Sequence, residues 1–193
     1  MLQKVSILLI SLLLLTSCGS DETISETSWL EWYNWEWYSI FLPSNWKIMT
    51  DKNNILPEPS EGKIELSAQA SEPKWSFTNN ILILSDTLKT FTDSSEYSMA
   101  NNVWARREYT EYLQLANEDF KFLDWTESTI YTFEAKYNLE TPKLKFLQTA
   151  YVCNPNKGYF LTIAISPSIK ITDKYETLLS TFSCIEDENI TNI

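Results

Sequence analysis

Apolar and polar residues alternate along much of the chain with the period of two that is typical of half-buried β-strands. The clearest case is residues 63–70, where Ile64, Leu66 and Ala68 occupy every second position. Residues 80–85 are almost continuously apolar, as expected of a central strand buried on both faces. The pattern predicts strands at residues 35–42, 46–49, 63–70, 80–85, 120–127, 129–137, 143–153 and 159–165.

Two segments carry helix signals. Residues 93–96 have the spacing of a capping box, which predicts a helix from there to about Leu115, with Tyr97 and Trp104 in its inner stripe. A shorter helix is predicted to begin at Asp173, where four apolar residues recur at helical spacing. Strands and helices together predict an α+β sandwich: a mostly antiparallel sheet with a long middle helix and a C-terminal helix.

The first residues have the pattern of an export signal. Lys4 precedes an apolar run over residues 5–15, which is too short to cross a hydrocarbon core that needs about 20 helical residues. Residues 15–18, Leu-Thr-Ser-Cys, resemble the lipobox of bacterial lipoproteins. This resemblance implies that residues 1–17 are a signal peptide and that Cys18 receives a lipid. The alternatives are an ordinary signal peptide with an incidental Cys, or an uncleaved anchor.

The remaining chain divides into a tether, a domain and a tail. Residues 18–31 begin with the lipidated Cys18 and continue as a small, polar and acidic segment, which predicts a flexible tether. Residues 32–186 are predicted to form a single α+β domain, and residues 187–193 a disordered tail. We therefore expect the protein to lie at the extracytoplasmic face of a membrane, held there by its N-terminal lipid.

Charge limits the partners of this domain. The chain has 15 basic and 26 acidic side chains, a net charge of −11. Removal of residues 1–17 takes away Lys4 alone and leaves 14 basic and 26 acidic side chains, a net charge of −12. Such a surface repels nucleic-acid phosphates and anionic lipid headgroups. We expect no nucleic-acid partner.

Cys153 and Cys184 form an even pair once Cys18 is lipidated. An exported domain meets an oxidising compartment, which favours a disulfide between them. In the chain-entropy model this bond stabilises the fold by roughly 3–4 kcal/mol. The alternative is two buried free thiols, since cysteine is a common core residue.

The composition removes most catalytic chemistry. The chain has no His, so Ser-His-Asp and Cys-His arrangements and His-ligated metals are excluded. Its three Gly do not form a phosphate-binding loop. A carboxylate pair such as Asp119 with Asp124 is chemically capable of acid–base catalysis, although an acidic solvated face explains it equally. We predict no catalytic residue, no cofactor and no metal site.

Aromatic residues are concentrated at the start of the domain. In a single strand, Tyr33, Trp35, Trp37 and Phe41 would share one face and pack in the core. Two functional interpretations stand beside that one. Amphipathic rings just beyond a membrane tether favour the headgroup interface, and Trp and Tyr also dominate the binding energy of protein partners. The candidate interface residues are Trp29, Trp32 and Tyr33.

Three short motifs resemble those of PsbP-like domains. Residues 41–46, Phe-Leu-Pro-Ser-Asn-Trp, are similar to the opening of such domains. Residues 144–152 and 157–162 are similar to their closing hairpin, and residues 179–182 to the end of their final helix. The resemblance covers residues 35–184 and rests on packing motifs.

The resemblance implies an αβα sandwich around an antiparallel sheet. In photosynthetic organisms, members of the family are extrinsic proteins of photosystem II. The cyanobacterial members are lipoproteins, as are bacterial relatives of the DcrB type, and members act by docking. Some bind divalent cations at positions that include His, which this chain lacks, so no metal site is carried over.

These observations predict a lipid-anchored, non-enzymatic envelope protein whose domain docks to, or helps assemble, a membrane protein complex. The partner is an unidentified membrane or envelope protein. The alternative is a lipoprotein that binds a small ligand or a cell-wall glycan with exposed aromatic side chains. A third hypothesis, a hydrolase, requires a carboxylate pair in a cleft.

Overall fold

The computed structural model describes residues 29–49, 62–73, 77–153, 156–170 and 172–185. The predicted signal peptide, Cys18, and the predicted tail at 187–193 lie outside these residues. The described part is an α+β domain in which every strand pairing is antiparallel. The predicted α+β class with a mostly antiparallel sheet is therefore confirmed.

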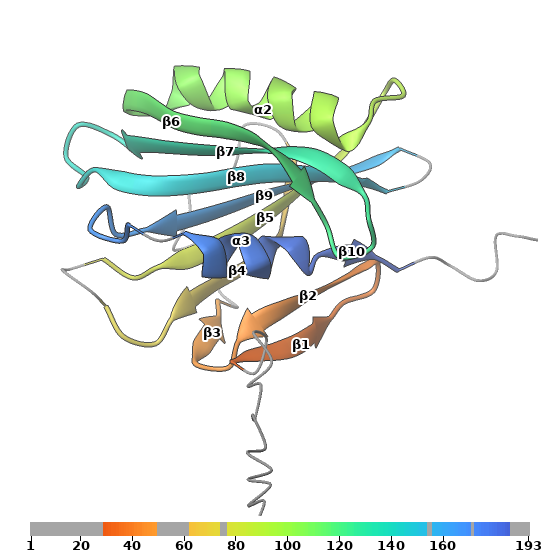
Figure 1. Cartoon of the computed structure of the whole chain (residues 1–193), viewed down its shortest axis with the longest axis horizontal. Helices are drawn as coiled ribbons and strands as arrows, with labels where there is room; N and C mark the ends of the chain where they lie inside the picture. Colours follow the sequence, from red (N-terminus) through yellow and green to blue (C-terminus); the bar gives the residue numbers. More distant parts are fainter. Residues whose placement is uncertain (1–28, 50–61, 74–76, 154–155, 171, 186–193) are drawn as a thin grey trace, which may run out of the picture.

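Two sheets organise the domain (Figure 1). The large sheet has seven strands in the order β3-β4-β5-β9-β8-β7-β6, and the small sheet has three in the order β1-β2-β10. The strands of the large sheet are β3 Trp46–Ile48, β4 Lys63–Ala70, β5 Asn80–Thr87, β6 Thr110–Lys121, β7 Glu127–Lys136, β8 Leu144–Cys153 and β9 Lys157–Ile165. Those of the small sheet are β1 Leu30–Asn34, β2 Tyr38–Pro43 and β10 Ser183–Cys184.

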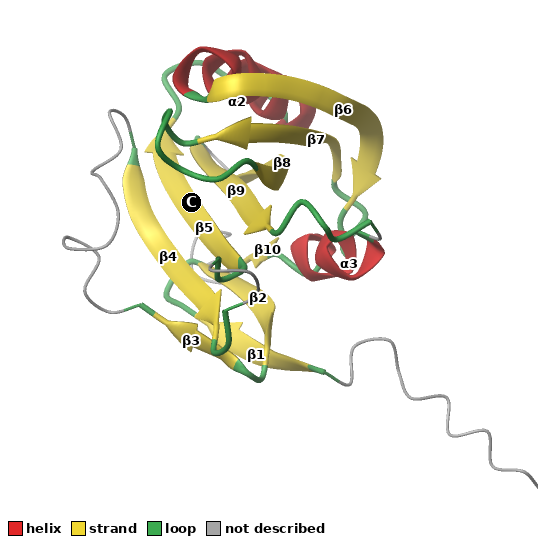
Figure 2. Cartoon of the chain, turned by 90° about the vertical axis from the view of Figure 1, so that its left-hand side faces the viewer, coloured by secondary structure: helices red, strands yellow, loops and turns green. Residues whose placement is uncertain are grey.

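The two faces of the large sheet are covered differently. Helix α2 (Ser94–Glu108) packs on β7, β8 and β9, while helix α3 (Asp173–Ser180) lies on the other side, beside the small sheet (Figure 2). Successive residues of β9 show the alternation: Phe160 packs with Tyr97 of α2, and Leu161 belongs to the main core with Leu178 of α3. The hydrophobic strand patterns therefore contribute to buried clusters on both faces of the large sheet.

Helix α2 begins as predicted and ends earlier. The Asp93 side chain accepts a hydrogen bond from the Glu96 N–H at 2.8 Å, which is the expected N-cap. The helix stops at Glu108, so the prediction that it extends to Leu115 is wrong. Residues from 110 onward form β6 because they pair with β7, and the Tyr112 ring stacks on Phe133 at 4.5 Å. Trp104, predicted to face inward, is 53 % exposed.

The N-terminal aromatic segment is a hairpin and not the single strand predicted over residues 35–42. β1 begins at Leu30, inside the segment expected to be tether, and a turn closed by a hydrogen bond from the Trp35 N–H to the Tyr38 carbonyl (2.9 Å) leads into β2. The predicted common face is consequently wrong. Phe41 lies opposite Trp32 across the hairpin, and Trp35 stacks on Tyr33.

The last described residues complete the small sheet. After α3, the Thr181 hydroxyl donates to the Leu178 carbonyl at 2.6 Å, and β10 then pairs with β2. This pairing brings Cys184 to Cys153 at the end of β8, with 6.0 Å between their Cα atoms and their sulfurs at disulfide distance. The geometry suits the predicted disulfide, and the oxidised bond in the cell stays a prediction.

Candidate functional site

Five of the exposed large apolar side chains lie together at one end of the domain, which we call the aromatic end. It consists of the β1–β2 turn, the β6–β7 turn and the residue after β10. Both turns hydrogen-bond to the same short segment: the Leu123 N–H donates to the Ser180 carbonyl at 2.9 Å, and the Ile185 N–H to the Trp37 carbonyl at 3.0 Å (Figure 1). The exposed members are Trp35, Trp37, Leu123, Trp125 and Ile185.

The β6–β7 turn is tightly closed. The Phe122 N–H donates to the Thr126 carbonyl at 2.9 Å, and the Trp125 N–H donates to the Phe122 carbonyl at 3.0 Å. Phe122 points into the main core, whereas Leu123 and Trp125 are 63 % and 78 % exposed. The turn therefore presents two large apolar side chains to the surface from a fixed backbone.

Trp125 adopts a left-handed backbone, with φ of 71°. This conformation costs a non-glycine residue about 1–2 kcal/mol, and it persists only where the surroundings fix it. Here Asp124 helps to fix it. Its Oδ1 accepts from the Thr126 N–H at 3.0 Å, and its Oδ2 accepts from the Tyr151 hydroxyl. The turn therefore holds Trp125 in a strained backbone while most of its ring stays exposed.

A buried aromatic cluster lies beneath the aromatic end and joins its two turns. The Tyr38 ring, at the start of β2, lies 5.4 Å from Phe182. Phe182 lies 5.3 Å from Tyr151, which in turn lies 4.8 Å from Phe122 in the other turn. Burial raises the pKa of Tyr38, and raises that of its neighbour Tyr159 to about 12. These rings form a dry, closely packed base for the exposed residues.

A buried carboxylate, Glu65, lies on the side of the main core near this cluster. Its Oε1 accepts from the Ser85 hydroxyl at 2.6 Å, and the ammonium groups of Lys63 and Lys157 lie 3.3 Å and 3.6 Å from its oxygens. Burial alone would raise the pKa of Glu65, but the Ser85 hydrogen bond and the two lysines outweigh it and hold the pKa below its ordinary value. Glu65 is therefore ionised and paired.

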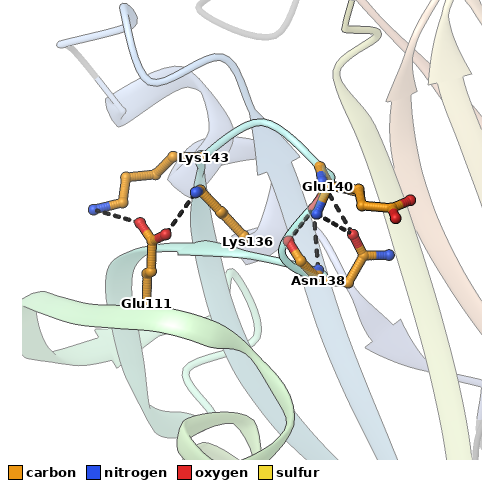
Figure 3. Close-up of polar contacts among 6 residues, drawn as sticks. Glu111, Lys136, Asn138, Glu140 and Lys143 are labelled. Carbon is orange, nitrogen blue, oxygen red and sulfur yellow. Dashed lines mark hydrogen bonds and ion pairs between the residues drawn. The ribbon is translucent and has the colours of Figure 1, made fainter.

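The opposite end of the β6–β7 hairpin carries ion pairs beside the exposed apolar side chains of Leu113, Tyr137 and Leu139. Glu111 contacts the Lys136 ammonium at 2.5 Å and the Lys143 ammonium at 4.0 Å (Figure 3). In the adjoining β7–β8 loop, Asn138 Oδ1 accepts from the Glu140 N–H at 2.9 Å. The hydrogen bond from Lys136 is the main reason that the pKa of Glu111 lies below its ordinary value. These contacts fasten the first residues of β6 to the neighbouring loop.

The predicted interface residues separate into two groups. Trp29 and Tyr33 are partly buried and pack against the main core. Trp32 is 54 % exposed and meets Phe41 edge to face, with 4.6 Å between the ring centroids. Of the three, Trp32 has the exposure that a partner needs. Leu123 and Trp125 were not among the predicted site residues. The Asp-Trp-Thr sequence of an Asx turn was the available signal for them.

The carboxylates considered for catalysis have structural positions, and the described residues do not form a metal site or an enclosed pocket. Both oxygens of Asp124 accept hydrogen bonds that hold the turn, and Asp119 lies opposite Thr129 in the β6–β7 pairing. Among the described residues, no three His, Cys, Asp or Glu side chains lie together as a metal site would require. The depression before α3, lined by Ser168, Ile169, Lys170, Asp173 and Lys174, is shallow and open. No helix within the described ranges is long and apolar enough to span a bilayer.

Comparison with known proteins does not place the chain in a family. No family model matches it, and neither does any curated protein. One similar solved structure is a Pseudomonas aeruginosa protein of unknown function, with 11 % identity and a TM-score of 0.46 over 72 % of this chain and 84 % of that one. Another is from Bacteroides thetaiotaomicron, with 10 % identity and a TM-score of 0.38 over 78 % of this chain and 46 % of that one. Sequence identities and TM-scores this low give no information about function.

Proposed function

We propose that this chain is a lipid-anchored, non-enzymatic envelope protein whose αβα-type domain, similar to PsbP-like domains, docks to a membrane protein complex or helps to assemble it. The sequence at residues 15–18 supports the anchor. The placement of α2 on one face of the large sheet, with α3 and the small sheet on the other, supports the sandwich. The open form of the depression before α3 favours docking over enclosure of a substrate.

The observation that carries the docking proposal is Trp32 on β1. It is 54 % exposed, although β1 itself is paired with β2 and the hairpin packs on the main core. A large aromatic side chain held on a rigid strand binds a partner at a small entropic cost, and Trp is enriched among residues that dominate protein interfaces. Trp32 is also only 14 positions beyond Cys18, which keeps it close to membrane proteins.

The anchor and the docking residue are tested separately in intact cells. Cys18→Ala is expected to move the protein out of the membrane fraction, because the apolar run at 5–15 is too short to span. In the lipidated protein, Trp32→Ala is expected to abolish specific cross-links to a membrane partner. Trp104→Ala is the matched control, since Trp104 is equally exposed on α2 and is expected to leave the cross-links intact. Unchanged cross-links in Trp32→Ala would contradict the docking surface.

A further inference from the structure

We infer that the aromatic end is a membrane-facing surface, which inserts its two turns into the headgroup interface of an electrically neutral bilayer. The inference rests on the proposed lipid anchor for its proximity to the membrane and adds a second, protein-borne contact. This contact would give the tethered domain one orientation and leave Trp32 and the rest of the surface for the protein partner.

The first argument is the reach of the chain. Leu30, the first residue of β1, lies twelve positions beyond Cys18. At no more than about 3.6 Å per residue, this stretch holds the start of β1 within roughly 43 Å of a lipid on Cys18, and the aromatic end begins at the other end of that short strand, at Trp35. A surface this close to a bilayer samples it at a high effective concentration, so a modest affinity is sufficient for stable contact.

The second argument is the kind of side chain. Three of the five exposed residues of the aromatic end are Trp, which favours the boundary between headgroups and acyl chains. The other two, Leu123 and Ile185, are aliphatic. Because the mature chain has a net charge of −12, attraction to anionic lipid cannot bring the domain to the surface. Partition of apolar side chains is then the available driving force, which is why we specify a neutral bilayer.

The third argument is the state of the backbone in the β6–β7 turn. A segment enters a weakly hydrated environment at low cost only if its polar groups already have partners. The N–H groups of residues 122, 123, 125 and 126 all donate to protein acceptors. The one acid of the β6–β7 turn, Asp124, accepts from the Thr126 N–H and the Tyr151 hydroxyl, whereas Glu36 in the β1–β2 turn is exposed. The β6–β7 turn can therefore lose water without leaving these groups unpaired.

Quenching by brominated phosphatidylcholine tests the surface directly. The full lipidated chain is reconstituted into neutral vesicles, and the fraction of Trp fluorescence quenched by the brominated lipid is measured for the wild type, Trp125→Phe, Trp37→Phe and Trp104→Phe. Trp37 and Trp104 form a matched pair, 50 % and 53 % exposed but on different surfaces. Trp125→Phe and Trp37→Phe are expected to lower the quenched fraction, because each removes a quenched fluorophore. Trp104→Phe is expected to raise it, because it removes one that lies away from the lipid.

The opposite results would overturn the inference. If all three variants lower the quenched fraction alike, the domain tumbles on its tether without a preferred face. If none lowers it, the aromatic end stays in water. Sedimentation of the same samples that showed a dimer dissociated by Trp125→Phe would assign the surface to a second copy instead. Failure of the anchor is distinguishable, because Cys18→Ala can be added to the same vesicles and the contrast between Trp125 and Trp104 measured without the lipid.

Discussion

The two ends of the β6–β7 hairpin share a strained backbone conformation but place different side chains on it. At each end a non-glycine residue has a left-handed backbone, Glu111 with φ of 55° and Trp125 with φ of 71°. Glu111 directs its carboxylate to two lysines, so its side chain helps to hold the strained position. Trp125 leaves 78 % of its side chain exposed, and its ring meets the Lys121 ammonium at 5.6 Å.

The comparison distinguishes a side chain that helps to hold the fold together, Glu111, from one that the fold leaves exposed at the surface, Trp125. At the Glu111 end, the ion pairs of Glu111 with Lys136 and Lys143 join β6 to the end of β7 and to the loop before β8. The turn at the aromatic end is instead closed by backbone hydrogen bonds, Asp124 and the buried Phe122, so it does not need the Trp125 ring to keep its shape. The Trp125 ring is therefore exposed by the turn and does not close it.

The largest expected effect comes from the buried base of the aromatic end. Phe122→Ala removes a fully buried ring that contacts Phe120 and Tyr151, and is expected to lower the free energy of unfolding by about 3–5 kcal/mol. Leu123→Ala, one residue away and exposed, is expected to change it by no more than about 0.5 kcal/mol. Urea denaturation measures both. Equal losses would show that the exposed tip also carries the packing of the turn.

An intermediate effect is expected at the two carboxylates that pair with lysines. Glu65→Gln is expected to cost about 1–3 kcal/mol at neutral pH, because Glu65 is buried and its charged partners lose their counter-charge. Glu111→Gln is the control and is expected to change stability little, because Glu111 is exposed to solvent. Urea midpoints at neutral pH compare them.

The lowered pKa of Glu65 also predicts how the stability of the protein depends on pH. The folded protein holds the pKa of Glu65 below its unfolded value of about 4.3, so its contribution is complete above that pH and is lost as the pH falls through the folded-state pKa. The stability difference between wild type and Glu65→Gln should therefore shrink in acid, below about pH 4. A difference that stayed constant down to pH 2 would contradict the ionised pairing of Glu65 with Lys63 and Lys157.

The smallest effect on stability is expected when the two left-handed residues, Trp125 and Glu111, are replaced by Gly. Trp125→Gly relieves the backbone strain and is expected to leave stability unchanged or raise it by at most about 1 kcal/mol, while lowering the quenching by brominated lipid. Glu111→Gly relieves similar strain but loses the contacts to Lys136 and Lys143, so no gain is expected. Thermal unfolding compares the variants. A marked destabilisation by Trp125→Gly would mean that the ring does maintain the fold.

The sequence by itself determined the features that local chemistry controls. Alternation in residues 63–70 and 143–153 identified strands, because one face of a sheet must be buried. Asp93 identified the start of α2, because its side chain can satisfy an N–H that the helix leaves free. Composition excluded His chemistry without any structure. The Cys153–Cys184 pairing was predicted from their number and the expected compartment, and the fold brings the two residues together.

Only the tertiary structure decided the rest. Residues 110–115 carry a pattern compatible with a helix, and they became strand because β7 offers them a partner and Phe133 a ring to stack on. The turn at Trp35 has no Gly or Pro, and Asn34 is its one turn-favouring residue, so the local signal for the hairpin was weak. The aromatic end joins residues 35–37, 123–125 and 185, which are brought together by the hydrogen bonds of both turns to residues 180–185 and by the buried aromatic rings beneath them. A surface assembled from such distant segments has no linear pattern, and the packing of the chain alone creates it.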